Sequence, residues 1–303
     1  MSEADTITSN AKSNLAFTLM DLPEERRRNM ARLYAFCRIV DDVVDEPGMT
    51  EEERHAALNR WEQVITCASE PAPGIETEVQ KLMQELQLDP APLLELIIGC
   101  RGDIAPVQPK TRHELLQYAY RVAACVGISS ATVMGASPAA REYAIALGYA
   151  LQLVNILRDV AEDCREHGRV YLPANDMELF GVTHDDIRNQ RYNYRFRQLL
   201  AYEAALAEKF FCEAEELYQN LSVEDRNSLI PAQAMSLIYH NILNKMADDE
   251  YRVFERRYSV NNFRKLWFLL RARLGTVEIP SIPGISDWSF LKNIGSLGKK
   301  EDE

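Results

Sequence analysis

Between Gly148 and Asp163 the chain reads GYALQLVNILRDVAED, an apolar stretch interrupted by polar residues at regular intervals. At about 100° per residue, polar residues at offsets of 0, 3, 7 and 11 fall on one stripe of a helix. Burying such groups without partners costs several kcal/mol, so the stripe faces water, a ligand or a satisfied polar network. Apolar flanks favour a ligand. The stripe consists of Gln152, Asn155, Asp159 and Asp163.

A second polar stripe lies in YAFCRIVDDVVDE, which runs from Tyr34 to Glu46. Offsets of 0, 4, 7 and 11 again place four residues on one helix face, with Asp42 at its edge. A lone DDxxD motif usually belongs to a solvated helix end. A tyrosine and an arginine on the same face, with apolar residues between, favour a cavity instead. The stripe consists of Tyr34, Arg38, Asp41 and Asp45.

The rest of the chain predicts an all-α fold. Apolar residues recur at intervals of three and four, without alternating strand patterns. Capping residues mark helix starts at Thr50, Thr111, Ser222 and the Asp21-Leu-Pro-Glu24 stretch, with Pro23 in the opening turn. We expect a flexible N-terminus over residues 1–11, one helical domain over 12–275 and a flexible tail over 276–303.

The composition excludes several classes of protein. The 303 residues include 34 Lys and Arg against 46 Asp and Glu, a net charge of −12, which argues against nucleic acid as a partner. The six cysteines lack metal-ligand spacing and are expected to be reduced core residues. No secretory signal pattern is evident, so the expected compartment is the cytoplasm. Peripheral membrane contact stays open as a route for product release, and nothing specifies an oligomeric state.

The two stripes together predict a particular chemistry. Paired carboxylates suit a hard divalent cation such as Mg²⁺, and the absence of His and Cys from both stripes argues against zinc. Two facing stripes would hold a Mg²⁺–diphosphate group, with Arg38, Arg158 and Arg169 available for the remaining negative charge. Departure of diphosphate from carbon leaves a carbocation, which requires a dry, apolar pocket with aromatic faces.

Three segments resemble the squalene and phytoene synthase family of head-to-head prenyl transferases. The most specific is LGxxxQxxNIxRDVxxD over residues 147–163, followed by RVYLP over residues 169–173. The second is YAYRVAACVG over residues 118–127, and the third is the DDVVD motif that begins at Asp41. The resemblance covers the chain from about Lys12 to about Arg257. It implies an isoprenoid synthase-type helical bundle around a central cavity.

The resemblance also implies residue roles. It implies Mg²⁺ ligands at Asp41, Asp45, Asn155, Asp159 and Asp163, with Arg38 and Tyr34 completing the catalytic set. It implies a diphosphate site or prenyl channel formed by Tyr118, Val122, Gly127, Gln152, Asn155, Arg158, Arg169 and Tyr171, and more loosely by Tyr239 and Arg256. The family's N-terminal His or Ser side chains are replaced here by a stretch containing Lys12, Ser13 and Asn14.

The implied reaction is Mg²⁺-dependent condensation of two prenyl diphosphates, farnesyl in preference to geranylgeranyl, through a presqualene-type cyclopropyl diphosphate. Products of this class are presqualene diphosphate, squalene, dehydrosqualene and phytoene. The final step is proton loss, water capture or hydride transfer from NADPH, and the sequence leaves these ends open. Two alternatives remain: a class I terpene cyclase that acts on one prenyl diphosphate, and a non-catalytic relative that acts as an assembly factor.

Overall fold

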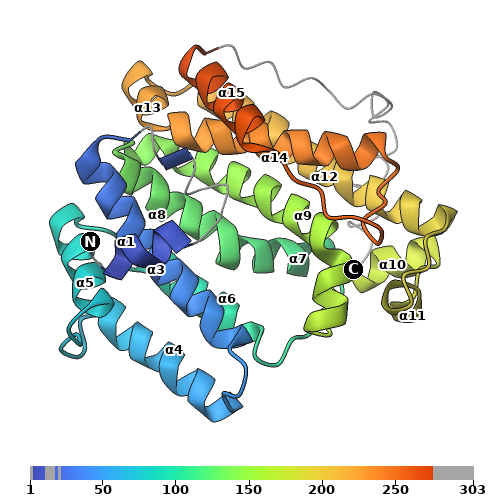
Figure 1. Cartoon of the computed structure of the whole chain (residues 1–303), viewed down its shortest axis with the longest axis horizontal. Helices are drawn as coiled ribbons and strands as arrows, with labels where there is room; N and C mark the ends of the chain where they lie inside the picture. Colours follow the sequence, from blue (N-terminus) through green and yellow to red (C-terminus); the bar gives the residue numbers. More distant parts are fainter. Residues whose placement is uncertain (1–2, 11–17, 20–21, 276–303) are drawn as a thin grey trace, which may run out of the picture.

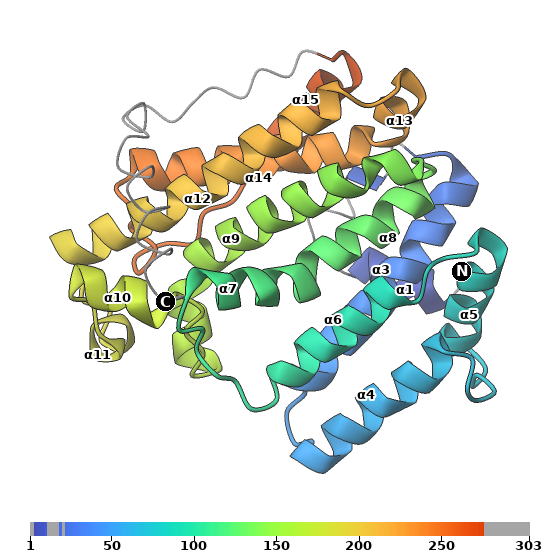
Figure 2. The ribbon, with the colours of Figure 1, turned by 180° about the vertical axis from the view of Figure 1, so that it is seen from behind.

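The structure is a computed structural model that describes residues 3–10, 18–19 and 22–275, and every regular element in this part of the chain is helical (Figures 1 and 2). The predicted all-α class is confirmed. The elements are α1 (Glu3–Asn10), α3 (Glu24–Asp45), α4 (Glu51–Ile65), α5 (Ile75–Leu86), α6 (Ala91–Gly102), α7 (Arg112–Ala119), η2 (Tyr120–Ala124), α8 (Cys125–Met134), η3 (Pro138–Ala140), α9 (Arg141–Glu166), α10 (Ala174–Phe180), α11 (His184–Arg188), α12 (Tyr194–Gln219), α13 (Val223–Ser228), α14 (Ile230–Asp248) and α15 (Asn262–Arg273).

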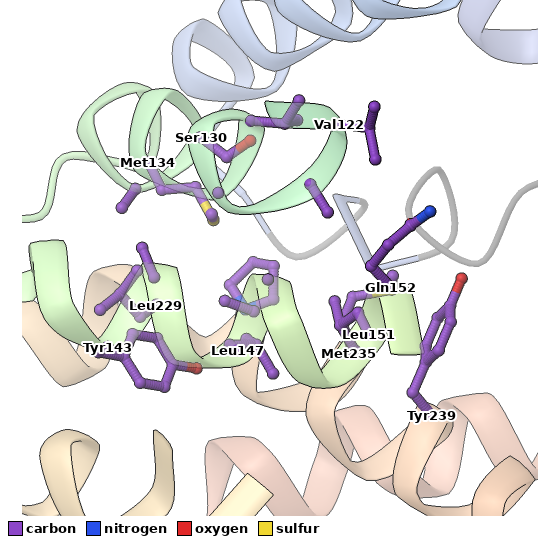
Figure 3. Close-up of a pocket in the computed structure, with 18 of the residues that line it drawn as sticks. Val122, Ser130, Met134, Tyr143, Leu147, Leu151, Gln152, Leu229, Met235 and Tyr239 are labelled. Atoms are coloured by element: carbon purple, nitrogen blue, oxygen red, sulfur yellow. The ribbon is translucent and has the colours of Figure 1, made fainter. Parts of the chain in front are cut away.

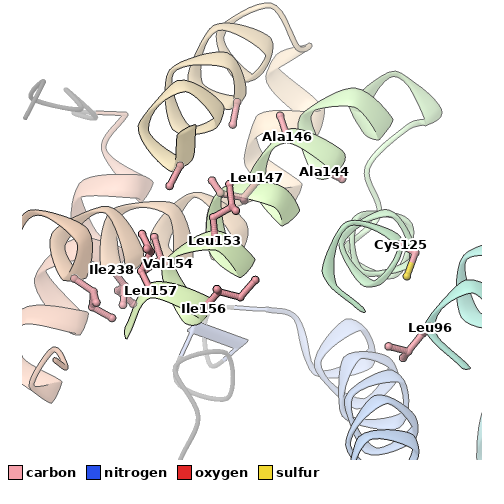
Figure 4. Packing of buried hydrophobic residues seen from close by; sticks show 14 of the residues in the cluster. Leu96, Cys125, Ala144, Ala146, Leu147, Leu153, Val154, Ile156, Leu157 and Ile238 are labelled. Carbon is pink, nitrogen blue, oxygen red and sulfur yellow. The ribbon is translucent and has the colours of Figure 1, made fainter. Parts of the chain in front are cut away.

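Helix α9 is the central element of the core. It packs against α12 and α14 on one side and against α8 and η2 on the other (Figures 1 and 2). Its buried side chains join those of the neighbouring helices in one hydrophobic cluster (Figure 4). The segment 138–166 is long and apolar enough to cross a membrane, but 56% of its most apolar window is buried inside the fold. Its hydropathy is therefore that of a core helix.

Two glycines allow α9 to approach its neighbours closely. A Cβ on Gly148 would lie 2.5 Å from the Cα of Ala124, and a Cβ on Gly127 would lie 2.8 Å from the carbonyl oxygen of Ala144. Ala124 belongs to η2, a π-helical turn that joins α7 to α8. Such turns are rare and are frequently found at functional sites. The helical pattern of the sequence does not predict this turn.

Three of the four predicted helix starts are confirmed. Thr50, Thr111 and Ser222 each accept a hydrogen bond from the backbone N–H three residues later. The fourth differs, because α3 begins at Glu24 with Pro23 as an N-cap that has no side-chain hydrogen bond. Asp21 lies outside the described residues.

One expectation about exposure is corrected. Residues 3–10 form α1, which packs against α3 and buries Ala4, and the flexibility predicted for residues 1–11 stays a prediction. The cysteines were expected in the core, yet Cys67 and Cys212 are exposed, whereas Cys100 and Cys125 are buried. All six are free thiols, as predicted. The flexible tail predicted for residues 276–303 lies outside the described residues and stays a prediction.

Candidate active site

Apart from Tyr34, the residues of the two polar stripes line one polar cavity of about 750 Å³. The last two turns of α3 supply Arg38, Asp41 and Asp45, and the C-terminal half of α9 supplies Asp159 and Asp163. The helical spacing read from the sequence therefore places the carboxylates of both helices around a shared space.

On the α3 side, arginine side chains partner the carboxylates. Arg38 pairs with Asp42 at 2.5 Å and with Asp41 at 3.4 Å, and Arg169 pairs with Asp45 at 2.9 Å. Asp41 opens onto the cavity, but the surrounding protein desolvates its carboxylate and raises its pKa to about 6. The carboxylates of Asp45 and Asp42 add to this rise, and Arg38 opposes it.

On the α9 side, the two carboxylates differ in their partners. Asp159 accepts two hydrogen bonds from Arg158, at 2.8 and 2.5 Å, and its other partner is Arg257, with Nε at 3.1 Å from Oδ1. Asp163 has no arginine within ion-pair distance among the described residues. Burial, followed by repulsion from Asp159 and Glu162, raises the pKa of Asp163 to about 7.

Asp103 lies between the two stripes and was not predicted. The hydroxyls of Tyr118 and Tyr171 each donate to its carboxylate at 3.0 Å, and their rings stack with centroids 4.7 Å apart. Arg169 donates to its backbone carbonyl at 3.0 Å. Burial raises the pKa of Asp103, and its charge in turn helps to raise the pKa of both Asp41 and Asp163.

An apolar cavity of about 240 Å³ adjoins the polar one. It lies between α8, α9 and α14, and Val122 and Gly127 are among its lining residues. Gln152, Asn155 and Tyr239 line both cavities, so the two spaces meet at these side chains. Figure 3 shows Gln152 and Tyr239 at one end of the apolar cavity and Met134 and Tyr143 at the other.

The donor set of the polar cavity fits a hard divalent cation. Its carboxylates and the Asn155 amide offer oxygen ligands, which Mg²⁺ prefers. The buried Oδ1 of Asn155 has no hydrogen-bond partner. Burial is the main cause of the raised pKa values of Asp41 and Asp163, and neighbouring carboxylates add to both. Among the described residues, no group of three Asp, Glu, His or Cys side chains is close enough together to hold a metal ion without rearrangement.

A family model for squalene/phytoene synthases matches residues 8–264. The chain belongs to this family. It is 35% identical over 266 residues to the chloroplastic phytoene synthase 3 of Zea mays, covering 85% of this chain and 61% of that protein. It is 34% identical over 269 residues to the phytoene synthase of Arthrospira platensis, covering 84% of this chain and 85% of that protein.

Two solved structures of squalene/phytoene synthase type share the fold. A dehydrosqualene synthase in complex with ligand superposes with a TM-score of 0.79 at 27% identity, covering 90% of this chain and 95% of that one. The squalene synthase HpnC from Alicyclobacillus acidocaldarius gives a TM-score of 0.73 at 27% identity, covering 82% of this chain and 93% of that one. The family consists of prenyltransferases that condense prenyl diphosphates head to head, and this chain is a prenyltransferase of that kind.

Two residues assigned by the likeness to squalene/phytoene synthases lie away from the cavities. Arg256 is 57% exposed and pairs with Asp249 at 3.4 Å, whereas the next residue, Arg257, lines the polar cavity. The tyrosine of the first motif, Tyr34, is half-buried on α3 and is absent from the described lining of either cavity. The structure thus places Arg257, which is 59% exposed, in the polar cavity, and a role of Arg256 in diphosphate binding stays a prediction.

The remaining assigned residues lie in the cavities. Arg158, Arg169, Tyr118 and Tyr171 line the polar cavity. The loop after α9 positions two of them, because the backbone N–H of Arg169 donates to the carbonyl of Asp163 and turns the chain back toward α6 and α7. The squalene/phytoene synthase segment with Lys12, Ser13 and Asn14 lies outside the described residues.

Proposed function

We propose that this protein joins two prenyl diphosphates head to head by ionising one of them in the polar cavity while its hydrocarbon chain occupies the apolar cavity. One observation carries the proposal: the charged and apolar cavities meet at Gln152, Asn155 and Tyr239. A prenyl diphosphate has the same division, with a highly charged head and an uncharged tail. The joined cavities therefore favour this amphiphile over a uniformly polar ligand.

Mg²⁺ would be held by the oxygen atoms of Asp41, Asp45, Asn155, Asp159 and Asp163. When bound, it would offset the charge of the departing diphosphate and make that group a better leaving group. The position of these five side chains around one cavity supports this assignment, and a bound cation would favour the ionised form of Asp41 and Asp163, whose pKa values burial raises.

Four arginines are available to the diphosphate. Each is paired with a carboxylate in the free protein: Arg38 with Asp41 and Asp42, Arg158 with Asp159, Arg169 with Asp45, and Arg257 with Asp159 and Glu162. A cation that takes over the carboxylates would free guanidinium groups for phosphate oxygens, which they bind strongly and often in bidentate geometry. Binding of cation and diphosphate should therefore reinforce each other.

The apolar cavity would protect the allylic cation that remains after diphosphate leaves. Its lining supplies few nucleophiles, and the rings of Tyr143 and Tyr239 can stabilise positive charge through their faces. The double bond of a second substrate would capture this cation and, with loss of a proton, form a cyclopropyl diphosphate. A second ionisation in the same polar cavity would allow rearrangement to a linear product.

Farnesyl diphosphate is the proposed substrate. The end of the apolar cavity away from the carboxylates is bounded by bulky side chains, among them Met134, Tyr143 and Leu229, which supports the shorter chain. The two structural neighbours, a dehydrosqualene and a squalene synthase, support the same choice. The phytoene synthases at 33–35% identity favour geranylgeranyl diphosphate as the second candidate.

The decisive experiment incubates the purified protein and Mg²⁺ with labelled farnesyl or geranylgeranyl diphosphate, with and without NADPH. Products are analysed by mass before and after phosphatase treatment. A dimeric hydrocarbon or a cyclopropyl diphosphate supports the proposal, and the mass of the product identifies the substrate and the final step. A product made from one substrate molecule indicates a terpene cyclase and overturns the proposal. The absence of Mg²⁺-dependent turnover favours a non-catalytic assembly factor.

A further inference from the structure

Helix α15 is hydrophobic on two opposite faces. Phe268, Leu269 and Ala272 are buried, and the helix packs on α14 at the surface of the molecule (Figures 1 and 2). At about 100° per residue, a second apolar group lies on the opposite side within an arc of roughly 100°. This exposed face consists of Phe263 (89% exposed), Leu266 (48%), Trp267 (58%), Leu270 (45%) and Leu274 (74%), the last of which is the C-cap.

The exposed face gathers large apolar side chains that are not packed in the core. Ten large hydrophobic residues are exposed in the described part of the chain, and five of them belong to this one short segment. Single exposed hydrophobic residues are ordinary, whereas a contiguous exposed apolar patch marks a contact with another surface. The patch therefore requires an apolar partner.

The charge of α15 indicates the chemistry of that partner. Residues 262–275 contain four basic residues, Arg264, Lys265, Arg271 and Arg273, and no acidic one, in a chain whose net charge is −12. On a helical wheel, Arg264 and Arg271 lie beside one edge of the exposed apolar face and Arg273 lies beside the other, and Arg271 and Arg273 also interact within the protein. Lys265 lies on the side of the helix that packs against the protein and is half-buried. Apolar residues between basic edges, with a tryptophan among them, are typical of helices that lie in a membrane interface.

We propose that α15 docks on an anionic lipid bilayer, with its axis in the plane of the interface and the Phe263–Leu274 face inserted among the lipids. Basic residues complement anionic headgroups, whereas a second copy of the same helix would bring like charges together. The inference goes beyond the proposed reaction and does not depend on it. If both hold, α14 connects the membrane-facing helix to the apolar cavity, which it lines through Met235 and Tyr239.

The test is flotation of the full-length protein with vesicles of phosphatidylcholine alone or mixed with phosphatidylglycerol. We expect binding to the anionic vesicles, and at least a tenfold weaker affinity after Phe263→Ser with Trp267→Ser or after Arg264→Glu. The matched control is Val107→Ser with Leu179→Ser, which removes exposed hydrophobic residues elsewhere, at 84% and 66% exposure, and should bind normally. Melting temperatures verify that all variants are folded.

Fluorescence gives a second measurement that does not depend on flotation. With Trp288 replaced by phenylalanine, Trp61, which is 5% exposed, and Trp267 remain, and only Trp267 should shift to the blue on binding. No binding to either vesicle overturns the proposal, as expected if residues 276–303 or a second copy cover the face. Equal binding to neutral vesicles overturns the anionic preference. Anionic binding that survives both α15 variants overturns the assignment to this helix.

Discussion

At the scale of the residue, replacement of Asp163 should affect turnover and stability in different ways. Its pKa is raised and no arginine of the described residues lies within ion-pair distance, so its charge is unfavourable in the free protein. Asp163→Asn should therefore leave the melting temperature unchanged or slightly higher while lowering turnover by about 100-fold or more, a loss of the size seen when one stabilising group is removed from an active site. Steady-state kinetics and thermal unfolding of the same preparation test both effects.

Asp42→Asn is the matched control. Asp42 belongs to the same motif but lies outside the described lining of the polar cavity, where it accepts a hydrogen bond from Arg38 at 3.0 Å. Its replacement should change turnover by only about two- to threefold, the range expected for an exposed ion pair. Equal losses in the two variants would contradict the assignment of Asp163 to the cation.

The pH dependence of stability follows from the same carboxylates. The pKa of Asp163 is about 7 and that of Asp41 about 6 in the folded protein, above the usual value near 4. A raised folded-state pKa means that protonation favours folding, so their contribution to stability is lost as pH rises from about 4 to 7. In a chelator, the melting temperature of Asp163→Asn should exceed that of the wild type by a few degrees more at pH 8 than at pH 5.

Added Mg²⁺ should reverse this trend in the wild type, because the cation binds the ionised carboxylates. Melting curves at the two pH values, with chelator and with Mg²⁺, provide the measurement. If the difference in melting temperature between the variant and the wild type is the same at both pH values, the pKa of Asp163 is not raised in the free protein.

Sequence spacing predicted the residues whose position depends on one helix alone. Asp41 and Asp45, like Asp159 and Asp163, share a helical face by the geometry of the α-helix, and both pairs line the cavity. Asp103 could not be found in this way, because it follows α6 without any periodic signal and enters the site only when α6 meets α7 and the loop after α9. That Arg257, and not Arg256, lines the polar cavity likewise depends on a loop conformation.

At the scale of the element, the crossing of α9 and η2 depends on the missing side chain of Gly148. A Cβ there would lie 2.5 Å from the Cα of Ala124, and backbone cannot move as a flexible side chain can. Gly148→Ala should cost about 1–3 kcal/mol, as overpacking of a core usually does. Thermal or denaturant unfolding would measure the loss.

Gly102→Ala is the control for this crossing. Gly102 lies in α6, and nothing is within 4 Å of where its Cβ would be. Its replacement should be neutral or stabilising by up to about 1 kcal/mol, since alanine loses less backbone entropy in a helix. A Gly148→Ala variant as stable as the wild type would show that α9 and η2 can separate without loss.

The helices themselves were more predictable than their junctions. Capping at Thr50, Thr111 and Ser222 is a local interaction, so three residues of sequence suffice to find it. The π-helical turn η2 falls inside a continuous helical pattern and leaves no signal in residue type. The start of α3 differs from the prediction by one position, because the backbone angle of Pro23 fits both the first turn and the N-cap.

At the scale of the whole molecule, ligand binding should add to stability cooperatively. Mg²⁺ and inorganic diphosphate together should raise the melting temperature by about 5 °C or more, and by more than the sum of their separate effects. A ligand at 100 times its Kd adds about 2.7 kcal/mol, and 1 kcal/mol shifts the melting temperature by about 2–4 °C in a large domain. The cooperativity arises because the cation competes for the carboxylates that hold the arginines.

Differential scanning fluorimetry with each ligand alone and with both provides the measurement. Asp163→Asn should lose most of the joint effect but keep part of the response to diphosphate alone. Strictly additive shifts would show that the arginines bind diphosphate without prior release from their carboxylate partners.

Helix α9 lines the apolar cavity at Gly148, both cavities at Gln152 and Asn155, and the polar cavity at Asp159 and Asp163. The helix rises about 22 Å between Gly148 and Asp163, so it fixes the distance between the two cavities. If the proposed substrate binds with its head group at the carboxylates, a longer hydrocarbon chain has to be accommodated at the far end of the apolar cavity. Mutations that retune product length can accumulate at the far end, around Met134, while the ionising end keeps its sequence.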